Sequence, residues 1–557
     1  MFSVKKNVLQ TVALLKAYGV KQIVLSPGSR NAPLMQTFSQ DAFFECHTIV
    51  DERNAAFYAL GIIQALQQPV AICCTSGSAL LNYAPAVSEA YYQQLPLIVV
   101  SADRSPEWIG QMDGQTLPQT GVFGSLSKKS VHLPEINNET DEWYCNRLIN
   151  EALIACTADA SGPVHINIPL YEPLFDYSEE SLPEVRKIDC ARPLKSVDII
   201  PFIDKWNKSP KRLIIVGQLF QTPELIKLLE DLATKSDCII FTENLSNSVS
   251  PLFISNFDAL LYAISEDQKE NFSPDLVITL GGHIVSKRLK HFIRQHRPKS
   301  HWHLTESGEV VDLFQSLTDL VETDALDFFS NLLSNISGNK EKPFFDLWKN
   351  ASKVIPEPTD DMPFSDISAT GDFLKVLPKN SALHLANSST VRNVQLFQLD
   401  KSIKVYCNRG VNGIESTLPS VVGFASVYKE PVYLIIGDLS FFYGLNALWN
   451  IQHIKNLRIL LINNGGGGIF HLLPGLNQAT SLKEYVSAEH NIQARNWALA
   501  AGLNYLSAES REELKKNLKA FTDTKTNQSV LLEISINMEI SKKTFQEYYH
   551  KLKTLRS

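Results

Sequence analysis

The 557-residue sequence contains no apolar run that approaches the ~18 residues needed to span a bilayer. Its start, MFSVKKNVLQTVALLKAYGV, has the spacing of an amphipathic helix. This start lacks the continuous apolar block and the small-residue cleavage site of a signal peptide. We therefore expect a cytoplasmic protein without a membrane partner.

Cysteine pairs of the Cys-x-x-Cys type are also missing from the sequence. Cys73 and Cys74 lie inside an apolar strand pattern, which favours reduced core thiols over zinc ligands or disulfides. His301-x-His303 lacks a nearby third ligand and is interpreted as structural. The eight cysteines are Cys46, Cys73, Cys74, Cys145, Cys156, Cys190, Cys238 and Cys407.

Positive charge is not in excess, because the net charge is −7 and no segment is dense in Lys and Arg. Both observations argue against a nucleic-acid partner. The phosphate-loop pattern Gly-x-x-x-x-Gly-Lys-Ser/Thr is absent as well. A hydrophobic content of 44% and a charged content of 20% are typical of a soluble globular protein. The length predicts roughly two to four domains.

Strand and helix patterns alternate along the chain. In the first third, four apolar strands each end in a polar or glycine-rich turn, as in a doubly wound parallel sheet. Polar stretches at 178–210 and 338–361 are interpreted as linkers. The sequence thus predicts an α/β protein with three doubly wound parallel-sheet domains, at 1–180, 181–345 and 346–557. The expected strands are 22–25, 48–50, 70–74 and 97–101, then 212–216, 238–241, 276–280 and 301–304, and finally 382–385, 404–406, 432–436, 458–462 and 530–534.

The most informative segment, 437–470, follows the expected strand 432–436 and predicts an amphipathic helix and then a second strand. Asp438 and Asn464, 26 positions apart, follow the two strands, where ligands gather in such sheets. A carboxylate and an amide oxygen suit Mg²⁺ or Mn²⁺, and the glycines after Asn464 let the main chain approach a metal or a phosphate. The alternative is a tight turn between buried elements. The pattern resembles the binding motif for thiamine diphosphate (ThDP).

A ThDP site also needs a carboxyl group that shares a proton with the pyrimidine ring of the cofactor. Glu52 is the candidate, at a strand-to-helix corner. Its alternative is a helix N-terminal acid that complements the dipole, as Asp51 is expected to be. Thr75, Ser76 and Gly77 begin another helix and are expected either to shape the pyrimidine pocket or to cap that helix.

Further motifs make the resemblance specific. They are, in order, SPGSRNAPL (26–34), VDERNAAFYALG (50–61), TSGSALLN (75–82), SADRSPE (101–107), DGQ (113–115), SKRL (286–289), NSSTVR (387–392), NRGVNGIE (408–415), GDLS (437–440) and NNGGGGIFHLLP (463–474). The chain resembles the 2-succinyl-5-enolpyruvyl-6-hydroxy-3-cyclohexene-1-carboxylate synthase (MenD) family of ThDP-dependent enzymes. This resemblance implies decarboxylation of 2-oxoglutarate and transfer of a succinyl carbanion equivalent to isochorismate in menaquinone biosynthesis.

The resemblance also implies residue roles. The catalytic residues would be Glu52 and Gln115, and the metal ligands Asp438, Asn464 and the main-chain oxygen of Gly466. Both substrates carry carboxylates, which arginine binds well. The substrate-binding residues would be Ser29, Arg30, Arg104, Gln115, Lys287, Arg288, Ser388, Arg392, Arg409, Phe470 and Leu473. The cofactor-binding residues would be Glu52, Thr75, Ser76, Gly77, Ser388, Ile414, Gly437, Asp438, Leu439, Ser440, Asn464 and Ile469, with Ile414 as an apolar wedge.

Two positions depart from the general ThDP pattern. Leu439 replaces the glycine that acetolactate synthases carry, as the resemblance to the MenD family predicts. Gly465 stands where relatives often have Asn or Asp, and this leaves open whether Gly466 is the residue whose main-chain oxygen binds the metal. Glu52 and Asp438 lie in different domains, so a homodimer or a dimer of dimers is expected. The alternatives are another ThDP-dependent 2-oxo acid decarboxylase or acetolactate-synthase-like ligase, and an inactive ThDP-fold binding subunit.

Overall fold

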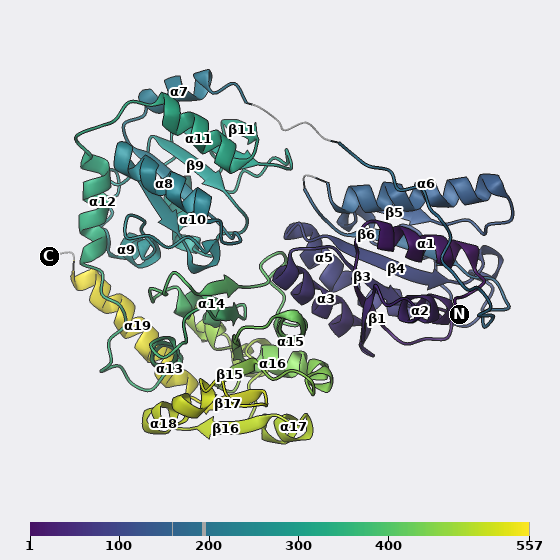
Figure 1. Cartoon of the computed structure of the whole chain (residues 1–557). Helices are drawn as coiled ribbons and strands as arrows, with labels where there is room; N and C mark the ends of the chain where they lie inside the picture. Colours follow the sequence, from purple (N-terminus) through teal and green to yellow (C-terminus); the bar gives the residue numbers. More distant parts are fainter. Residues whose placement is uncertain (159, 192–196, 556–557) are drawn as a thin grey trace.

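The computed structural model describes residues 1–158, 160–191 and 197–555, and it contains three parallel sheets (Figure 1). The N-terminal sheet has the order β2-β1-β3-β4-β6-β5, and the C-terminal sheet, β13-β12-β14-β15-β17-β16, repeats that order. The central sheet has the order β11-β10-β9-β7-β8. The predicted α/β class with three doubly wound domains is therefore confirmed. No helix in the described ranges is long and apolar enough to cross a membrane.

The N-terminal unit contains α1 (Lys6–Ala17), β1 (Gln22–Leu25), α2 (Ala32–Gln40), β2 (Glu45–Thr48), α3 (Glu52–Leu66), β3 (Val70–Cys74), α4 (Ser78–Asn82), α5 (Ala84–Tyr92), β4 (Leu97–Asp103), β5 (Lys129–His132), α6 (Glu139–Cys156) and β6 (Val164–Pro169). The central unit contains α7 (Ile200–Asn207), β7 (Arg212–Val216), α8 (Pro223–Lys235), β8 (Cys238–Thr242), α9 (Phe257–Ala263), β9 (Leu276–Leu280), α10 (Lys287–Gln295), β10 (Ser300–Thr305), β11 (Asp319–Glu322), α11 (Ala325–Asn335) and α12 (Pro343–Lys353). The C-terminal unit contains α13 (Asp366–Leu374), β12 (Ala382–Leu385), α14 (Ser389–Val394), β13 (Lys404–Tyr406), α15 (Thr417–Val427), β14 (Val432–Gly437), α16 (Asp438–Tyr443), β15 (Leu457–Asn463), α17 (Arg495–Ala500), β16 (Asn504–Ala508), α18 (Arg511–Phe521), β17 (Val530–Ser535) and α19 (Met538–Thr554).

The interior strands match the predicted ones closely, and the errors gather at the sheet edges. The edge strands β5, β11 and β16 were not predicted, and β2 lies at 45–48 instead of 48–50. These four edge strands are partly exposed, so they lack a continuous apolar run. The inner strand β6 also escaped prediction, because His165 and Asn167 interrupt its apolar pattern.

Two expected linkers contain helices, and one expected helix is interrupted. The stretch 178–210 includes α7, and 338–361 includes α12. Trp348 of α12 is fully buried in the core of the central sheet, so the central domain extends through α12. We propose the domain division near the predicted bounds, with the second one moved to the end of α12. After Asp438, the expected helix is a short α16 followed, beyond Gly444, by a 3₁₀ helix.

The prediction that the cysteines are thiols in the core is confirmed for six of the eight. All are free thiols, but Cys46 and Cys190 are exposed, so they are not core residues. His301 and His303 lie on β10, where both contact the Thr279 hydroxyl, at 3.1 and 2.9 Å, which agrees with a structural role.

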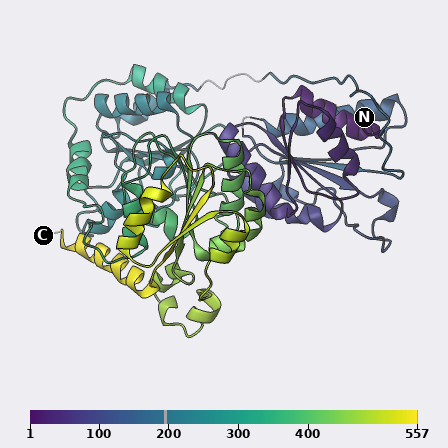
Figure 2. The same ribbon diagram turned by 60° about the horizontal axis from the view of Figure 1, so that its bottom comes forward.

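The N-terminal domain lies to one side of the other two, and its helix α3 packs against α15 of the C-terminal domain (Figures 1 and 2). The backbones of α3 and α15 approach so closely that glycine is required on both. A Cβ on Gly61 would lie 1.8 Å from the Ser420 oxygen, and one on Gly423 would lie 2.0 Å from the Tyr58 oxygen. Because Glu52 begins α3, this contact fixes the candidate acid relative to the C-terminal domain.

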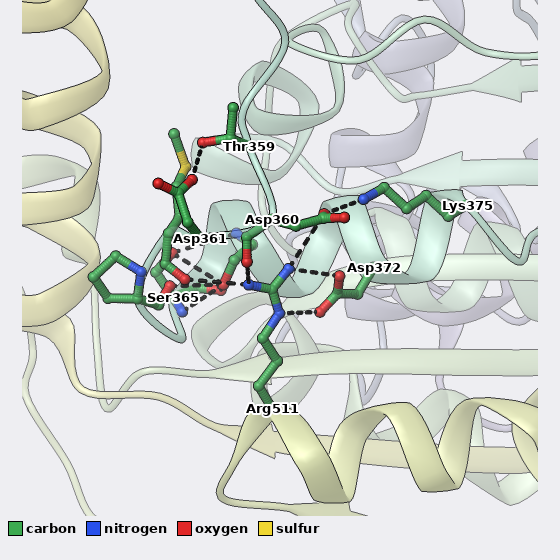
Figure 3. Close-up of polar contacts among 10 residues, drawn as sticks. Thr359, Asp360, Asp361, Ser365, Asp372, Lys375 and Arg511 are labelled. Atoms are coloured by element: carbon green, nitrogen blue, oxygen red, sulfur yellow. Dashed lines mark hydrogen bonds and ion pairs between the residues drawn. The ribbon is translucent and has the colours of Figure 1, made fainter.

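Arg511 of α18 ties the segment before α13 to the C-terminal domain (Figure 3). It pairs with buried Asp372 of α13 through two nitrogens, one of them 2.7 Å from Oδ1, and donates to the main-chain oxygens of Asp360 and Met362. Removing one partner of a buried ion pair costs about 3 kcal/mol, because the other charge stays buried.

We therefore expect Arg511→Met to lower the melting temperature of the C-terminal domain by several degrees, as measured by scanning calorimetry. Lys375→Met is the matched control, since Lys375 is exposed and pairs with the exposed Asp360, so its loss should leave the melting temperature unchanged. Equal melting temperatures for both variants would contradict the assignment of Arg511.

Candidate functional site

Oxygen atoms from two turns meet beyond the carboxyl ends of β14 and β15. The Asn464 amide oxygen lies 2.7 Å from the main-chain oxygen of Gly466 and 3.3 Å from Asp438 Oδ2. An amide oxygen that faces two other oxygens needs a cation among them, or a rotated amide whose nitrogen donates to both. A set made only of oxygens fits a hard divalent cation such as Mg²⁺. The described residues contain no cluster of three or more His, Cys, Asp or Glu that could hold a metal, so this mixed set is the candidate metal site.

The Asp438 carboxylate is held by the main chain around it. Oδ2 accepts from the N–H groups of residues 464, 465 and 466 at 3.1, 2.7 and 3.0 Å, and Oδ1 accepts from Leu439 at 2.6 Å. Burial raises the pKa of Asp438, and these N–H groups and His490, whose Nε2 lies 3.6 Å away, partly oppose that rise. The carboxylate is therefore oriented before any metal binds.

The glycines after Asn464 allow this wrapping. Gly465 and Gly466 have φ angles of +80° and +149°, which L-residues with a side chain rarely adopt. A Cβ on Gly466 would lie 2.7 Å from the Ser487 main-chain oxygen. Gly465 therefore suits its turn, although relatives often carry Asn or Asp there.

A cavity of about 750 Å³ lies beside this turn, between the central and C-terminal domains. It brings together residues from both domains that the sequence predicted as one site: Lys287, Arg288, Arg392, Asn464, Ile469 and Leu473. Phe470 is not part of the lining, because its ring packs over Gly467. The cavity therefore joins the metal turn to three predicted substrate cations and two residues of the predicted apolar wall.

Several positive charges lie close together near the cavity. Burial lowers the pKa of Arg392, and the neighbouring Arg409 lowers it further. Burial also lowers the pKa of Lys290, with Glu243 opposing and Arg409 and Arg392 adding to the shift. Arg409 is 8% exposed, donates to Asn387 Oδ1 at 2.7 Å, and leaves its Nε without a partner among the described residues. This excess of positive charge suits a ligand with more than one carboxylate.

Arg288 is already engaged within the protein. Its guanidinium contacts Asp258 and lies over the rings of Tyr262 and Tyr549, 4.8 and 4.2 Å from their centroids. Asp258 and Tyr549 also line the cavity. Arg288 can therefore bind a ligand only through the guanidinium N–H groups that Asp258 leaves free.

The predicted pyrimidine pocket lies in the N-terminal domain. Asp51 caps α3 by accepting from Asn54 N–H at 3.1 Å, so the ordinary helix-capping role belongs to Asp51. No hydrogen bond of the Glu52 carboxylate occurs within the described ranges, and its charge contributes, after burial, to the raised pKa values of Cys74 and Tyr83. Glu52 thus lies beside the buried end of β3 and is available to a ligand.

Polar atoms without partners mark the same pocket. The Thr75 and Ser76 hydroxyls are buried and have no hydrogen-bond partner among the described residues. Gly77 has a φ of +87° and donates to Gln119 Oε1 at 2.8 Å. A Cβ on Gly77 would lie 3.1 Å from Cα of Gln115, so Gln115 is next to this turn. Unpaired buried hydroxyls beside Glu52 fit a heteroaromatic ring with donors and acceptors.

The other N-terminal residues predicted for the site differ in burial and in their partners. Arg30 is buried and occupied, since it donates to the Leu170 oxygen at 2.9 Å and pairs with Glu172 at 3.0 Å. Arg104 Nη2 donates to the Gly114 oxygen at 3.2 Å, and its buried Nε has no hydrogen-bond partner in the described part of the chain. Ser29 and Gln115 are exposed. None of these residues lines the cavity, whose lining begins at Thr242.

The remaining predicted residues surround the metal turn. Ser440 donates to the Ile414 main-chain oxygen, and Arg392 donates to the Ser388 main-chain oxygen. Ser388 has a φ of +74° at the N-terminus of α14. Gly437 ends β14 in open space, where a Cβ would meet nothing. The Asp438 turn thus contacts the Ile414 loop directly.

The chain matches three family models. They are "Thiamine pyrophosphate enzyme, N-terminal TPP binding domain" (9–125), "Middle domain of thiamine pyrophosphate" (188–385) and "Thiamine pyrophosphate enzyme, C-terminal TPP binding domain" (388–534). It is 49% identical, over 99% of this chain and 100% of the relative, to a 2-succinyl-5-enolpyruvyl-6-hydroxy-3-cyclohexene-1-carboxylate synthase of Bacteroides thetaiotaomicron. The chain belongs to this synthase family. A Flavobacterium psychrophilum synthase of the same name is 38% identical over 97% of this chain and 98% of its own.

A solved structure of benzoylformate decarboxylase from Polynucleobacter necessarius has the same fold as this synthase-family chain. The TM-score is 0.74, the identity 18%, and the match covers 96% of this chain and 99% of the other. The predicted family and enzyme class are confirmed, and the thiamine pyrophosphate domain models support ThDP as the cofactor.

Sequence reasoning missed several polar residues of the synthase-family site. Glu243, Asp258 and Tyr549 line the cavity, and Lys290 lies close enough to Arg392 and Arg409 for their charges to lower its pKa. The sequence shows Lys290 in the basic start of α10, a signal that could have identified it. Nothing local distinguishes Glu243 or Tyr549, because each reaches the cavity only through the packing of distant elements.

Proposed function

We propose that this chain is a ThDP- and Mg²⁺-dependent carboligase that decarboxylates 2-oxoglutarate and adds the succinyl unit to isochorismate. The product would be 2-succinyl-5-enolpyruvyl-6-hydroxy-3-cyclohexene-1-carboxylate, in menaquinone biosynthesis. The observation that carries the proposal is the single cavity in which Asn464 lies with Lys287, Arg288 and Arg392. That the candidate metal turn and these cations line one cavity supports a site for carboxylate substrates.

Asp438, Asn464 and the Gly466 oxygen would hold the metal, and Mn²⁺ would fit the same oxygens. Thr75, Ser76 and Glu52 would hold the pyrimidine ring. When bound, ThDP would supply an acidic carbon that becomes a nucleophile and a ring that stabilises the electron pair left behind when CO₂ departs. The contribution of Glu52 is a proton shared with a nitrogen of that ring, which a partly buried carboxyl group can hold.

The cations bind and orient the substrates. The pKa values of Arg392 and Lys290 are lowered partly by neighbouring positive charges, so a dicarboxylate would relieve this repulsion. Arginine forks fix the direction of a bound carboxylate through paired hydrogen bonds. Ile469 and Leu473 supply apolar surface beside Asn464 and exclude water from the reacting carbon.

We also propose that two copies of the chain complete each site. Glu52, Arg104 and Gln115 do not line the cavity of their own chain, whose lining residues all lie between Thr242 and Tyr549. Glu52 is nevertheless available at the start of α3. A homodimer, or a dimer of dimers, would supply these groups from the partner subunit.

The deciding assay supplies purified protein with ThDP, Mg²⁺, 2-oxoglutarate and isochorismate. We expect loss of isochorismate with release of one CO₂ per isochorismate consumed, and no reaction when Mg²⁺ is chelated. Turnover of pyruvate without isochorismate consumption would instead support another 2-oxo acid decarboxylase or an acetolactate-synthase-like ligase. ThDP binding without turnover of any 2-oxo acid would indicate an inactive binding subunit.

A further inference from the structure

Two loops that carry predicted substrate cations are held by buried glutamates in the same way. One loop includes Arg409, Gly410 and Val411, and the other leads into Lys287 and Arg288 at the start of α10. In each loop, two consecutive main-chain N–H groups donate to the two oxygens of one carboxylate. The glutamates are Glu89 for the first loop and Glu243 for the second.

Glu89 reaches the Arg409 loop across a domain boundary. It belongs to α5 of the N-terminal domain and is fully buried. Its oxygens accept from Gly410 N–H and Val411 N–H, each at 2.7 Å. A Cβ on Gly410 would lie 2.7 Å from the Glu89 main-chain oxygen, so only glycine permits this approach.

The C-terminal domain holds the same loop from the other side. Asn387 donates to the main-chain oxygens of Asn408 and Gly413 at 2.8 and 2.9 Å, and its own oxygen accepts from Arg409. The Arg409 backbone is therefore fixed between Glu89 and Asn387. A side chain with a fixed backbone loses less entropy on binding a carboxylate.

Glu243 repeats this arrangement in the central domain. It follows β8, is 4% exposed and lines the cavity, and its oxygens accept from Val285 N–H and Ser286 N–H at 2.7 Å each. Ser286 caps α10 by accepting from Leu289 N–H at 3.0 Å. The anchor thus sets the position at which α10 begins, immediately before Lys287 and Arg288.

Neither carboxylate forms an ion pair with a Lys or Arg nitrogen within 4.0 Å among the described residues. Burial raises the pKa of both carboxyl groups, that of Glu243 to about 7, and the paired N–H groups oppose the rise. A buried carboxylate without a cation is costly, and hydrogen bonds offset that cost: two main-chain N–H groups donate to each glutamate, and the Gln93 side-chain amide also donates to Glu89. Because main-chain N–H groups satisfy each carboxylate, neither glutamate competes with a ligand for Lys287 or Arg409.

We propose that Glu89 and Glu243 are positioning residues, which fix the Arg409 loop and the Lys287–Arg288 loop for binding the substrate carboxylates. This inference rests on the proposed function for its substrates, whereas the anchoring of the loops does not depend on it. Each glutamate acts on its own loop, so each serves as the control for the other.

The test compares Glu89→Gln, Glu243→Gln and wild-type protein, with Glu45→Gln on the N-terminal surface as a neutral control. A glutamine amide offers one acceptor and places an NH₂ against the second N–H. Hydrogen–deuterium exchange should therefore rise about tenfold in residues 409–413 for Glu89→Gln and in 284–288 for Glu243→Gln. Each variant should leave the loop of the other unchanged. Glu89→Asp, which keeps the charge but is one methylene shorter, should also loosen 409–413.

In the carboligase assay, each glutamine variant should raise the KM of at least one carboxylate substrate about tenfold, with a smaller change in kcat and unchanged ThDP affinity. Unchanged exchange in the targeted loop would overturn the anchor. Faster exchange with an unchanged KM would overturn the positioning role. Wild-type protein that consumes neither substrate would refute the proposed function, while the exchange data would still decide the anchors.

Discussion

Glu52→Gln is expected to lower kcat by roughly three orders of magnitude while ThDP still binds. Glutamine keeps the size and polarity of the side chain, but it cannot share a proton with the pyrimidine ring. Glu52 begins α3, has no hydrogen bond to its carboxylate among the described residues, and lies beside the buried end of β3. No other residue predicted for that pocket has a carboxyl group that could supply this proton. Stopped-flow or steady-state turnover with a parallel ThDP titration measures both effects.

Asp51→Asn is the matched control for Glu52. Asparagine caps helices about as well as aspartate, so the α3 cap to Asn54 N–H should survive, while the charge and the acceptor for the Asn54 and Asn446 amides are lost. If the helix dipole were the reason for acids at this corner, both variants would have similar, small effects. Near-normal turnover of Glu52→Gln would show that Glu52 does not activate the cofactor.

Asp438→Ala should weaken Mg²⁺-dependent ThDP binding by roughly 100-fold or more, because even partners of metal ligands cost 10–100-fold when removed. Asp438 is the only one of the proposed metal ligands that carries a full negative charge. Its carboxylate also accepts hydrogen bonds from the N–H groups of residues 464 to 466. Its loss would remove a metal ligand and release the turn. The affinity is measured by titrating ThDP at saturating Mg²⁺ and again with chelator.

Asp438→Asn separates the two contributions. The amide retains an oxygen acceptor for the turn but lacks the charge that attracts the metal. It should lose metal-dependent affinity with a smaller fall in melting temperature than Asp438→Ala. Asp400→Asn, on the surface of the same domain, should change neither quantity. ThDP affinity that is equal in Asp438→Ala and wild-type protein would refute the metal site.

The turns that follow interior strands were predictable because their signals are local. An apolar run such as Val432–Ile436 must be buried, and parallel strands bring their carboxyl ends to one edge. Asp438 and Asn464 were identified in this way, whereas Glu52 follows the edge strand β2, which was predicted at 48–50 and lies at 45–48. The edge strands β5, β11 and β16 were not, since partial exposure removes the apolar signal.

Long-range packing decided which predicted residues share a space. Lys287, Arg392 and Asn464 come from separate segments of two domains, yet they line one cavity. Arg30 has the same residue type and sits in an equally specific motif, but folding pairs it with Glu172. Composition and spacing do not distinguish these outcomes, because a guanidinium takes whichever acceptor the tertiary fold brings near.

The fold class, the enzyme family and the turn at Asp438–Asn464 were predictable from the sequence, because each strand pattern and each motif is a short run of neighbouring residues. Only the tertiary structure showed how the cations are held. Glu89 and Glu243 anchor loops that lie 321 and 42 positions away in the chain. Such contacts leave no periodic pattern, since the hydrogen bonds run from a buried carboxylate to main-chain N–H groups that every residue except proline possesses.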